Sequence, residues 1–287
     1  MILRELVRDV AQRLRTAPLH YGHGTTNPRD EAAFLVLRGL GLPFDAPADR
    51  PLGRRDQARV ERLVQRRIRE RMPVAYLLHE AWLAGQSFYV NRRVVIPRSH
   101  IAELLQDRLR PWLHRPVRRV LDLCTGSGCL AVLAAQAFPR AAVDASDLSS
   151  AALAVAARNV ARHRLRARVQ LAPADLYSAF RGKRYDLIVA NPPYVGAASM
   201  NALPREYLHE PRLALAGGKE GLDFVRRIIE QAFERLEPRG LLVCEIGNNR
   251  KALERAFPRT PFAWPETAAG QVFVLSREGL PREQNVG

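Results

Sequence analysis

The residues with the clearest chemical potential are four in a row, Asn191-Pro192-Pro193-Tyr194. They follow an apolar run at 185–190 that predicts a buried strand, and ligands of α/β proteins bind beyond the carboxyl ends of parallel strands. The side-chain oxygen of Asn191 and the backbone carbonyl of Pro192 can both accept hydrogen bonds from a planar –NH₂ group. The prolines stiffen the backbone, so these acceptors are in place before the group arrives. Tyr194 offers a flat surface beside it.

A second candidate site is the segment LDLCTGSG at 121–128, between a predicted strand and a predicted helix. Glycine at 126 and 128 lets the backbone turn tightly and approach a ligand closely. Backbone amides at the helix start favour a negative group such as a carboxylate. Asp147 ends the next predicted strand, where an acid can accept hydrogen bonds from a ribose. Asp175 follows the third strand and is predicted to lie near an adenine.

The glycine turn alone leaves the cofactor open. Gly126-x-Gly128-x-x-Ala131 also fits the dinucleotide fingerprint of nicotinamide enzymes, and a plain structural turn is a further alternative. The motif after the fourth strand favours methyl transfer from a sulfonium. A planar –NH₂ nitrogen is a poor nucleophile because its lone pair is delocalised, so the site must hold it in line with the methyl group. This chemistry needs positioning and desolvation rather than a metal or a strong base. We therefore expect S-adenosylmethionine as the cofactor and no metal.

The elements that would position these groups alternate along the second part of the chain. Predicted strands cover residues 117–122, 141–146, 169–171, 185–190, 240–246 and 273–275. Predicted helices cover residues 128–138, 149–161 and 222–236, the second capped by Ser149. Such alternation implies a mostly parallel sheet with helices on both faces.

The first part of the chain, to about residue 80, is predicted to be helical. Apolar residues recur at helical spacing near the start, and Asn27 followed by Pro28 predicts the beginning of a second helix. A third helix is predicted at 54–71. It carries a row of arginines that is either a solvated face or an RNA-contacting face. These are Arg55, Arg59, Arg62, Arg66 and Arg69.

Between the two parts, alternating apolar residues at 88–90 and 94–96 predict a β-hairpin around residues 91–93. A helix at 99–113 is expected to follow, with Pro111 and Pro116 marking its boundary.

Composition limits the class of protein. The chain has 287 residues, of which 47% are hydrophobic and 26% charged, as in a globular protein with one large and one small domain. No apolar run approaches the roughly 18 residues of a membrane span, and the first residues lack a signal-peptide pattern. We therefore expect a soluble, cytoplasmic protein that does not bind membranes. The three cysteines, Cys124, Cys129 and Cys244, have no CxxC spacing, which argues against disulfides and zinc.

With both motifs in place, the chain resembles the amino-methyltransferase class of Rossmann-like enzymes, and most closely the HemK/PrmC-like protein-glutamine methyltransferase family. The stretches that carry the resemblance are 21–25, 73–77, 88–90, 96–98, 121–130, 191–195 and 209–211. The resemblance implies a Rossmann-like, seven-stranded α/β fold dependent on S-adenosylmethionine. It also implies a helical substrate-recognition domain at 1–80, a β-hairpin linker at 81–97 and a methyltransferase domain at 98–287.

The resemblance further implies the roles of individual residues. The methionine part of the cofactor would lie against 124–128, the ribose would meet Asp147, the adenine would lie near Asp175 and Leu176, and 191–194 would hold a glutamine. The complete set of cofactor-binding candidates is Asp122, Cys124, Thr125, Gly126, Ser127, Gly128, Asp147, Asp175, Leu176 and Asn191. Cys124 stands where related proteins often have glycine. For His23, we expect a structural or docking role, because methyl transfer to an amide needs no histidine.

Within the family, the chain resembles the branch that methylates a glutamine side-chain amide in large-subunit ribosomal protein L-three. Its expected partner is that protein in an RNA-containing assembly particle, and we expect a monomer. The net charge of +16 also supports an alternative, an amino-methyltransferase acting on adenine or cytosine in nucleic acid. Such enzymes must flip the base and usually carry a recognition domain, which we do not identify here. A non-catalytic ribosome-assembly factor is a third alternative.

Overall fold

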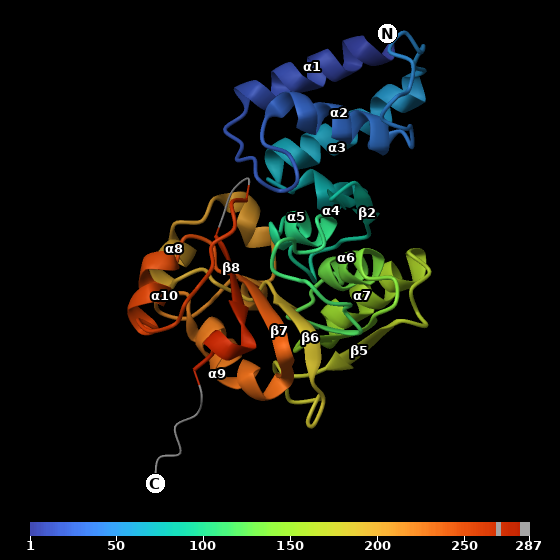
Figure 1. Ribbon diagram of the computed structural model, residues 1–287. Helices are drawn as coiled ribbons and strands as arrows, with labels where there is room; N and C mark the ends of the chain where they lie inside the picture. Colours follow the sequence, from blue (N-terminus) through green and yellow to red (C-terminus); the bar gives the residue numbers. More distant parts are fainter. Residues whose placement is uncertain (268–270, 282–287) are drawn as a thin grey trace.

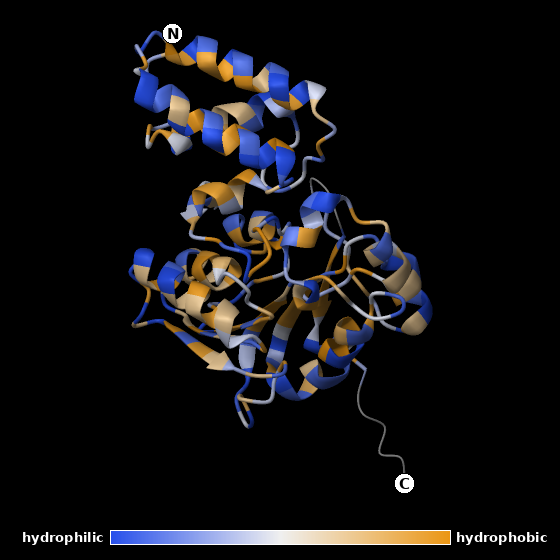
Figure 2. Ribbon diagram, turned by 180° about the vertical axis from the view of Figure 1, so that it is seen from behind, coloured by the Kyte–Doolittle hydropathy of each residue, from blue (hydrophilic) through white to orange (hydrophobic). Residues whose placement is uncertain are grey.

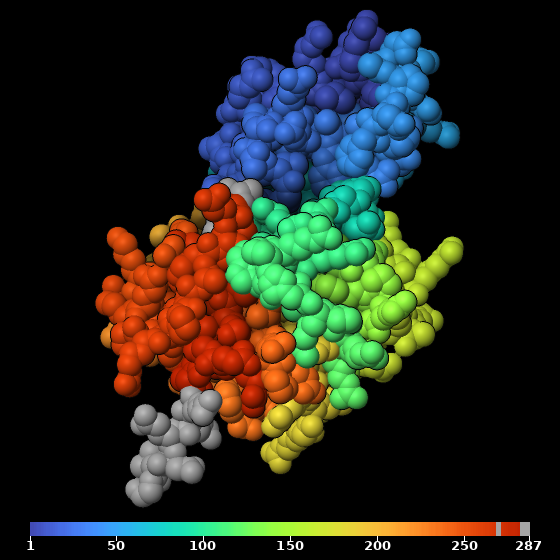
Figure 3. Space-filling view, viewed as in Figure 1, coloured from blue at the N-terminus to red at the C-terminus, as the bar shows by residue number. Residues whose placement is uncertain are grey.

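The computed structural model describes residues 1–267 and 271–281, arranged as two lobes (Figure 1). Positions 268–270 and 282–287 of the expected methyltransferase domain lie outside the described residues. The space-filling view in Figure 3 shows the smaller, N-terminal lobe stacked on the larger one across a narrower waist. None of the described helices combines the length and the apolar character that a membrane crossing requires.

The N-terminal lobe consists of four helices, α1 (Leu3–Thr16), α2 (Pro28–Gly39), α3 (Arg54–Arg69) and α4 (Val74–Leu78). The predicted start of α2 is confirmed, because the side chain of Asn27 accepts a hydrogen bond of 2.9 Å from the backbone N–H of Asp30. Figure 2 shows orange and blue patches along these helices. The helices α1 and α3 bury one face only, whereas four consecutive residues of α2, from Phe34 to Leu37, are buried.

The β-hairpin exists, but its predicted position is wrong. Its strands are β1 (Ala81–Leu83) and β2 (Gln86–Phe88), joined through Ala84 and Gly85 with φ angles of 51° and 74°. The second predicted strand at 94–96 is instead an irregular segment that begins with a turn, in which the side chain of Asn91 accepts a hydrogen bond from the N–H of Arg93. The apolar alternation there reflects burial against the large lobe and not strand pairing.

The next helix, α5 (Ile101–Gln106), is shorter than the predicted 99–113. Arg108 and Leu109 adopt left-handed φ angles of 53° and 58°, which a helix cannot continue through. The N–H of Leu109 donates to the carbonyl of Leu104 at 2.7 Å, closing the helix end. Leu109 is completely buried, so packing into the core accompanies this turn.

The sheet of the large lobe is mostly parallel, as predicted. Its strand order is β5-β4-β3-β6-β7-β8, and only β8 runs antiparallel to its neighbour. The bounds are β3 (Arg119–Leu123), β4 (Ala142–Asp147), β5 (Val169–Pro173), β6 (Tyr185–Ala190), β7 (Leu236–Glu245) and β8 (Val272–Ser276). The described residues therefore form six strands in this sheet and not the expected seven. Beside β8, Ala263 makes only an isolated bridge with Val274.

Helices cover both faces of this sheet. On one face lie α5, α6 (Cys129–Ala137) and α7 (Ser150–Arg162); on the other lie α9 (Asp223–Arg235) and α10 (Arg250–Ala256). The long connection from β6 to α9 holds the short helix α8 (Ala197–Asn201) and the 3₁₀ turns η1 (Arg205–His209) and η2 (Arg212–Ala214). A last turn, η3 (Arg277–Gly279), follows β8.

One buried amide joins the segment after the hairpin to the large lobe. Asn159 in α7 is fully buried, and its side-chain N–H groups donate to the carbonyls of Tyr89 at 2.9 Å and Ser127 at 2.8 Å. Its side-chain oxygen accepts from the N–H of Tyr89 at 2.7 Å. The amide therefore uses both its donor and its acceptor functions to hold two separate segments.

Replacing Asn159 by leucine should lower the free energy of unfolding by about 2–5 kcal/mol, because it leaves buried backbone groups without partners. Urea denaturation measures this loss. The control is Asn201→Leu on the exposed end of α8, which should change stability by less than about 0.5 kcal/mol. A loss at Asn159 as small as that of the control would contradict the role of this amide.

Candidate functional site

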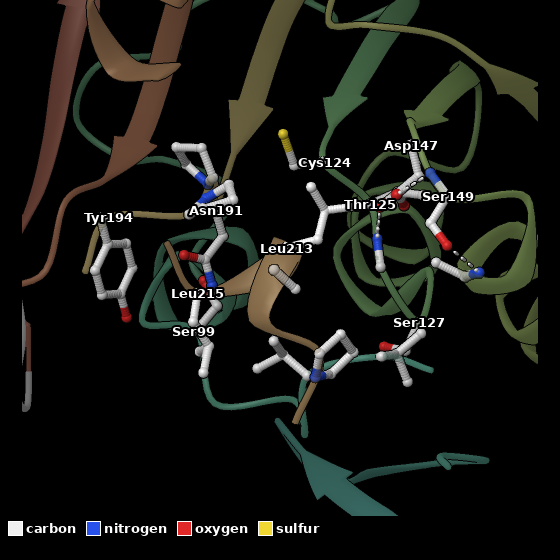
Figure 4. Close-up of a pocket in the computed structure, with 18 of the residues that line it drawn as sticks. Ser99, Cys124, Thr125, Ser127, Asp147, Ser149, Asn191, Tyr194, Leu213 and Leu215 are labelled. Carbon is white, nitrogen blue, oxygen red and sulfur yellow. Dashed lines mark hydrogen bonds between the residues drawn. The ribbon is translucent and has the colours of Figure 1, made fainter. Parts of the chain in front are cut away.

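A pocket of about 430 Å³ at the carboxyl edge of the sheet brings the two sequence motifs together. Its floor comes from the turn after β3, from the ends of β4 and β5, and from the Asn-Pro-Pro-Tyr segment after β6. Its walls come from residues 93–99 and from the connection around 203–215. Figure 4 shows Asn191 and Tyr194 on one side of the pocket, opposite Cys124, Thr125 and Asp147.

The glycine turn after β3 has the left-handed backbone that its sequence predicted. Gly126 and Gly128 have φ angles of 54° and 78°. A Cβ atom on Gly128 would lie 3.0 Å from the Cβ of Ala156, so glycine there lets α6 begin directly against α7. Cys124 also has a positive φ, 57°, which is unfavourable for a residue with a side chain. Burial raises the pKa of its thiol, so the group stays neutral.

Asp147 links this turn to the next loop. Its Oδ2 accepts a hydrogen bond from the N–H of Gly126 at 2.9 Å, and its Oδ1 accepts one from the N–H of Ser149 at 2.8 Å. Burial raises the pKa of Asp147, although the N–H groups of Ser149 and Gly126 oppose the rise. Each carboxylate oxygen has a second lone pair, so the group can still accept hydrogen bonds from ligand hydroxyls.

Two of the predicted cofactor-binding residues do not line the pocket that the described residues form. Asp122 is completely buried beneath the turn, where its Oδ2 accepts a hydrogen bond from the hydroxyl of Thr125. Burial raises the pKa of Asp122 to about 7. Gly128 packs on α7 as described above. The structure therefore places Asp122 and Gly128 under the turn, whereas Cys124, Thr125, Gly126 and Ser127 line the pocket.

The far end of the pocket is formed by the residues after β5. Asp175 and Leu176 both line it, as predicted for an adenine site. The carboxylate of Asp175 is exposed and forms an ion pair of 2.7 Å with Arg227 of α9. Leu176 is almost completely buried and has a φ of 50°.

The side chain of Asn191 is available for a ligand. It lines the pocket, and among residues 1–267 and 271–281 its side-chain amide has no hydrogen-bond partner. It therefore keeps its full capacity to accept a hydrogen bond from a bound group. Pro192 and Pro193 also line the pocket.

Tyr194 is held by several contacts at the end of β7. Its hydroxyl donates to Oε1 of Glu245 at 3.3 Å, and its carbonyl accepts from the side-chain N–H of Asn249 at 2.8 Å. A Cβ on Gly247 would lie 2.8 Å from the ring of Tyr194, so there is no room for a side chain at position 247. Burial raises the pKa of Tyr194, and the nearby Glu245 carboxylate adds to the rise, so the hydroxyl stays protonated.

Glu245, Gly247 and Asn249 were missed by the sequence analysis. Glu245 is nearly completely buried, and its Oε2 accepts from the hydroxyl of Ser99 at 2.7 Å and from the N–H of His100 at 2.9 Å. Burial raises the pKa of Glu245. A signal was present, because Glu245 lies near the end of the strand predicted at 240–246, and Gly247 and Asn249 follow it, as the two recognised motifs follow their strands.

His23 lies behind the pocket wall and not in its lining. It is 5% exposed, and its ring centroid lies 4.4 Å from that of Tyr207. Burial lowers the pKa of His23 to about 4, so the ring is neutral at neutral pH. This position agrees with a structural role for the Tyr-Gly-His-Gly-Thr segment, residues 21–25.

The three cysteines are free thiols. Among the described residues, no group of three or more His, Cys, Asp or Glu side chains is placed to hold a metal ion.

The residues that line the pocket fit S-adenosylmethionine. Left-handed backbone at Cys124 and Gly126 exposes the turn to the pocket. Among the described residues beyond its chain neighbours, only the Cys124 carbonyl lies within 4 Å of where a Cβ of Gly126 would be. Asp147 would offer carboxylate oxygens to ribose hydroxyls, and Leu148 and Leu176 would offer apolar surface beside them. When bound, the cofactor provides a methyl group on a positively charged sulfur.

Comparisons with known proteins agree with this geometry. Residues 102–218 match the family model "Methyltransferase small domain". The chain is 52% identical to a "Ribosomal protein uL3 glutamine methyltransferase" of Bordetella pertussis, over 97% of this chain and 96% of that protein. It is 48% identical to a protein of the same name from Neisseria gonorrhoeae, over 98% of this chain and 96% of the relative. These relatives confirm the predicted family resemblance, and the methyltransferase match implies S-adenosylmethionine as the methyl donor.

The fold is confirmed independently by a solved structure. The catalytic domain of hMettl16, crystallised with a hairpin of the MAT2A 3′UTR, superposes with a TM-score of 0.52 at 16% identity, covering 82% of this chain and 84% of that one. At this identity the likeness concerns the methyltransferase fold alone.

Replacing Asp147 by alanine should weaken S-adenosylmethionine binding about 5- to 100-fold, because it removes ribose acceptors worth about 1–3 kcal/mol and frees the Gly126 amide. Isothermal titration calorimetry measures the affinity. The control is Asp144→Ala on the same strand, a carboxylate outside the pocket, which should leave affinity within about twofold. Unchanged affinity in the Asp147 variant would remove this residue from the cofactor site.

Proposed function

The chain belongs to the family of ribosomal protein uL3 glutamine methyltransferases, and we propose that it transfers a methyl group from S-adenosylmethionine to the side-chain amide nitrogen of a glutamine in uL3. The observation that carries the proposal is the unpartnered amide of Asn191. It lies in the same pocket as the glycine turn, beside a tyrosine held on β7.

In this proposal, the chain acts mainly by positioning. The side-chain oxygen of Asn191 and the carbonyl of Pro192 accept hydrogen bonds from the two N–H groups of the glutamine amide. Tyr194 remains a neutral, flat surface because burial raises its pKa. Together they fix the plane and direction of the amide, so that its nitrogen faces the turn at Cys124. Proximity and alignment of this kind can supply several kcal/mol of catalysis without a base.

The proposal also assigns a separate role to each lobe. Residues 1–80 recognise the protein substrate, 81–97 link the lobes, and 98–287 carry out transfer. The enzyme works as a monomer in the cytoplasm, on uL3 within an RNA-containing assembly particle. Support for the RNA contact comes from the outer face of α3, where five arginines are exposed: Arg55, Arg59, Arg62, Arg66 and Arg69.

Replacing Asn191 by alanine should reduce turnover on uL3 more than about 100-fold while S-adenosylmethionine affinity stays within about threefold, because the lost acceptor aligns the substrate. Mass spectrometry of uL3 from cells lacking the enzyme, after incubation with it, measures the gain of one methyl group. Asn201→Ala on α8 serves as the control and should remain fully active.

The same assay, with labelled cofactor, tests the substrate class. Purified uL3 and its assembly particle are offered beside ribosomal RNA and genomic DNA of the same cells. Label in uL3 is expected. Label in nucleic acid with none in protein would refute the proposed function in favour of the adenine or cytosine alternative.

Reversing the charge of Arg59, Arg62 and Arg66 to glutamate should reduce activity on the assembly particle severalfold more than activity on free uL3, because RNA phosphates attract this face. Rates are compared at low and high salt, since a phosphate contact weakens with salt. The matched control reverses three exposed arginines of the large lobe, Arg166, Arg181 and Arg184. Equal effects on both substrates would identify the arginine row as a solvated face.

A further inference from the structure

One wall of the pocket is a segment with little regular structure of its own. Residues 203–215, between β6 and α9, contribute Leu203, Tyr207, Pro211, Leu213, Ala214 and Leu215 to the lining. Within it lie only the short turns η1 and η2. Leu213 is 53% exposed, yet Glu206 and Glu210 are almost completely buried. The position of this wall is therefore set by what the two glutamates bind.

Glu206 is bound entirely from the N-terminal side. Its Oε1 accepts hydrogen bonds from Arg67 at 3.2 Å, from Arg71 at 3.1 Å and from the backbone N–H of His20 at 3.0 Å. Burial disfavours the charge of Glu206, but these hydrogen bonds outweigh it and lower its pKa to about 2. The glutamate is therefore ionised at any pH at which the enzyme works.

Arg67, on the inner face of α3, has a side chain that is only 1% exposed. Besides Glu206, it donates to Oε1 of Glu31 at 2.7 Å and to the carbonyl of His20 at 2.9 Å. A desolvated arginine needs all these partners, since an unpaired buried charge is very unfavourable. The hydrogen bonds of Arg67 therefore fix the position of Glu206, and with it the position of the segment 203–215.

Glu210 is bound mainly by Ile96 and Arg98, where the linker segment meets the large lobe. Arg98 donates to its two carboxylate oxygens at 2.6 and 2.7 Å, and the N–H of Ile96 donates at 2.9 Å. Two parallel hydrogen bonds of this kind fix the orientation of the Glu210 carboxylate as well as its distance from Arg98. Arg98 and Ile96 themselves line the pocket.

Tyr207 lies between these two anchors and faces the pocket. Its ring centroid is 5.3 Å from the guanidinium carbon of Arg98 and 4.4 Å from the ring of His23. A Cβ added to Gly22 would lie 3.3 Å from the tyrosine hydroxyl. The Tyr-Gly-His-Gly-Thr segment of the N-terminal lobe therefore packs directly on the back of a pocket residue.

From this arrangement we infer that Tyr207 is a specificity-determining residue that contacts the glutamine-bearing segment of the protein substrate. Arg67 and Glu206 are positioning residues, through which the N-terminal lobe fixes the position of Tyr207. This inference rests on the proposed function. In it, the N-terminal lobe supports one wall of the substrate pocket from behind and also provides a separate docking surface. The cofactor side of the pocket, at Asp147 and Cys124, comes from other elements and is independent of this anchor.

The test measures kcat and KM for uL3 together with S-adenosylmethionine affinity and melting temperature. Tyr207→Leu should raise KM for uL3 about tenfold or more, with kcat changed less and cofactor affinity within about twofold, because the substrate contact is lost while Asp147 and the glycine turn are unchanged. Glu206→Leu should produce the same KM-weighted loss through displacement of the wall. Glu206→Gln should restore much of it, because its amide oxygen can still accept from His20 and Arg71.

The control is Glu61→Gln. Glu61 forms a two-pronged ion pair with Arg13, at 2.6 and 2.9 Å, which is partly exposed, lies inside the N-terminal lobe and is away from the pocket segment. It should leave both kinetic constants unchanged. If Glu206→Leu fails to fold, Tyr207→Leu and Glu206→Gln still decide the question. Unchanged KM in Tyr207→Leu, or losses in the Glu206 variants that follow melting temperature alone, would overturn the inference. No methylation of uL3 by the wild-type enzyme would instead refute the proposed function.

Discussion

The register of β3 between its two parallel neighbours is the constraint on which the site depends. Leu123, the last residue of β3, lies opposite Ser146 of β4 on one side and Ala190 of β6 on the other. The residues that follow each strand therefore emerge together at one edge, which brings Cys124, Asp147 and Asn191 into one pocket although they are far apart in the chain. A shift of one residue in either pairing would reverse the faces of a whole strand and separate these groups.

Close packing makes the loops at this edge stiff. Glycine at 128 and 247 lets helix α7 and the ring of Tyr194 approach the backbone, while Asp147 bridges the turn and the loop after β4 through two backbone amides. None of these contacts involves the side chain of Asn191. The structure thus separates groups that build the pocket from the group left available to a substrate, as expected for catalysis that relies on preorganised geometry.

The two lobes meet through polar contacts as much as through apolar ones. Asn159 holds the segment after the hairpin, and the buried Arg67 joins α3 to Glu31 and Glu206. Buried ion pairs contribute little net stability compared with apolar packing, but they permit only a narrow range of geometries. This explains how a small helical lobe with its own core can define the wall of a pocket in another lobe.

The local features of this protein can be predicted from its sequence. Asn27-Pro28 marked a helix start, the apolar run at 185–190 marked a buried strand, and the glycine turn and Asn-Pro-Pro-Tyr marked the two halves of the pocket, because each depends on residues adjacent in the chain. Long-range packing, by contrast, sets the hairpin position, leaves an isolated bridge at Ala263 where a seventh strand was expected, and gives Glu245 and Tyr207 their partners. Apolar alternation reports that a segment is buried but not which segment it pairs with, and a buried glutamate acquires its meaning from partners that lie more than a hundred residues away.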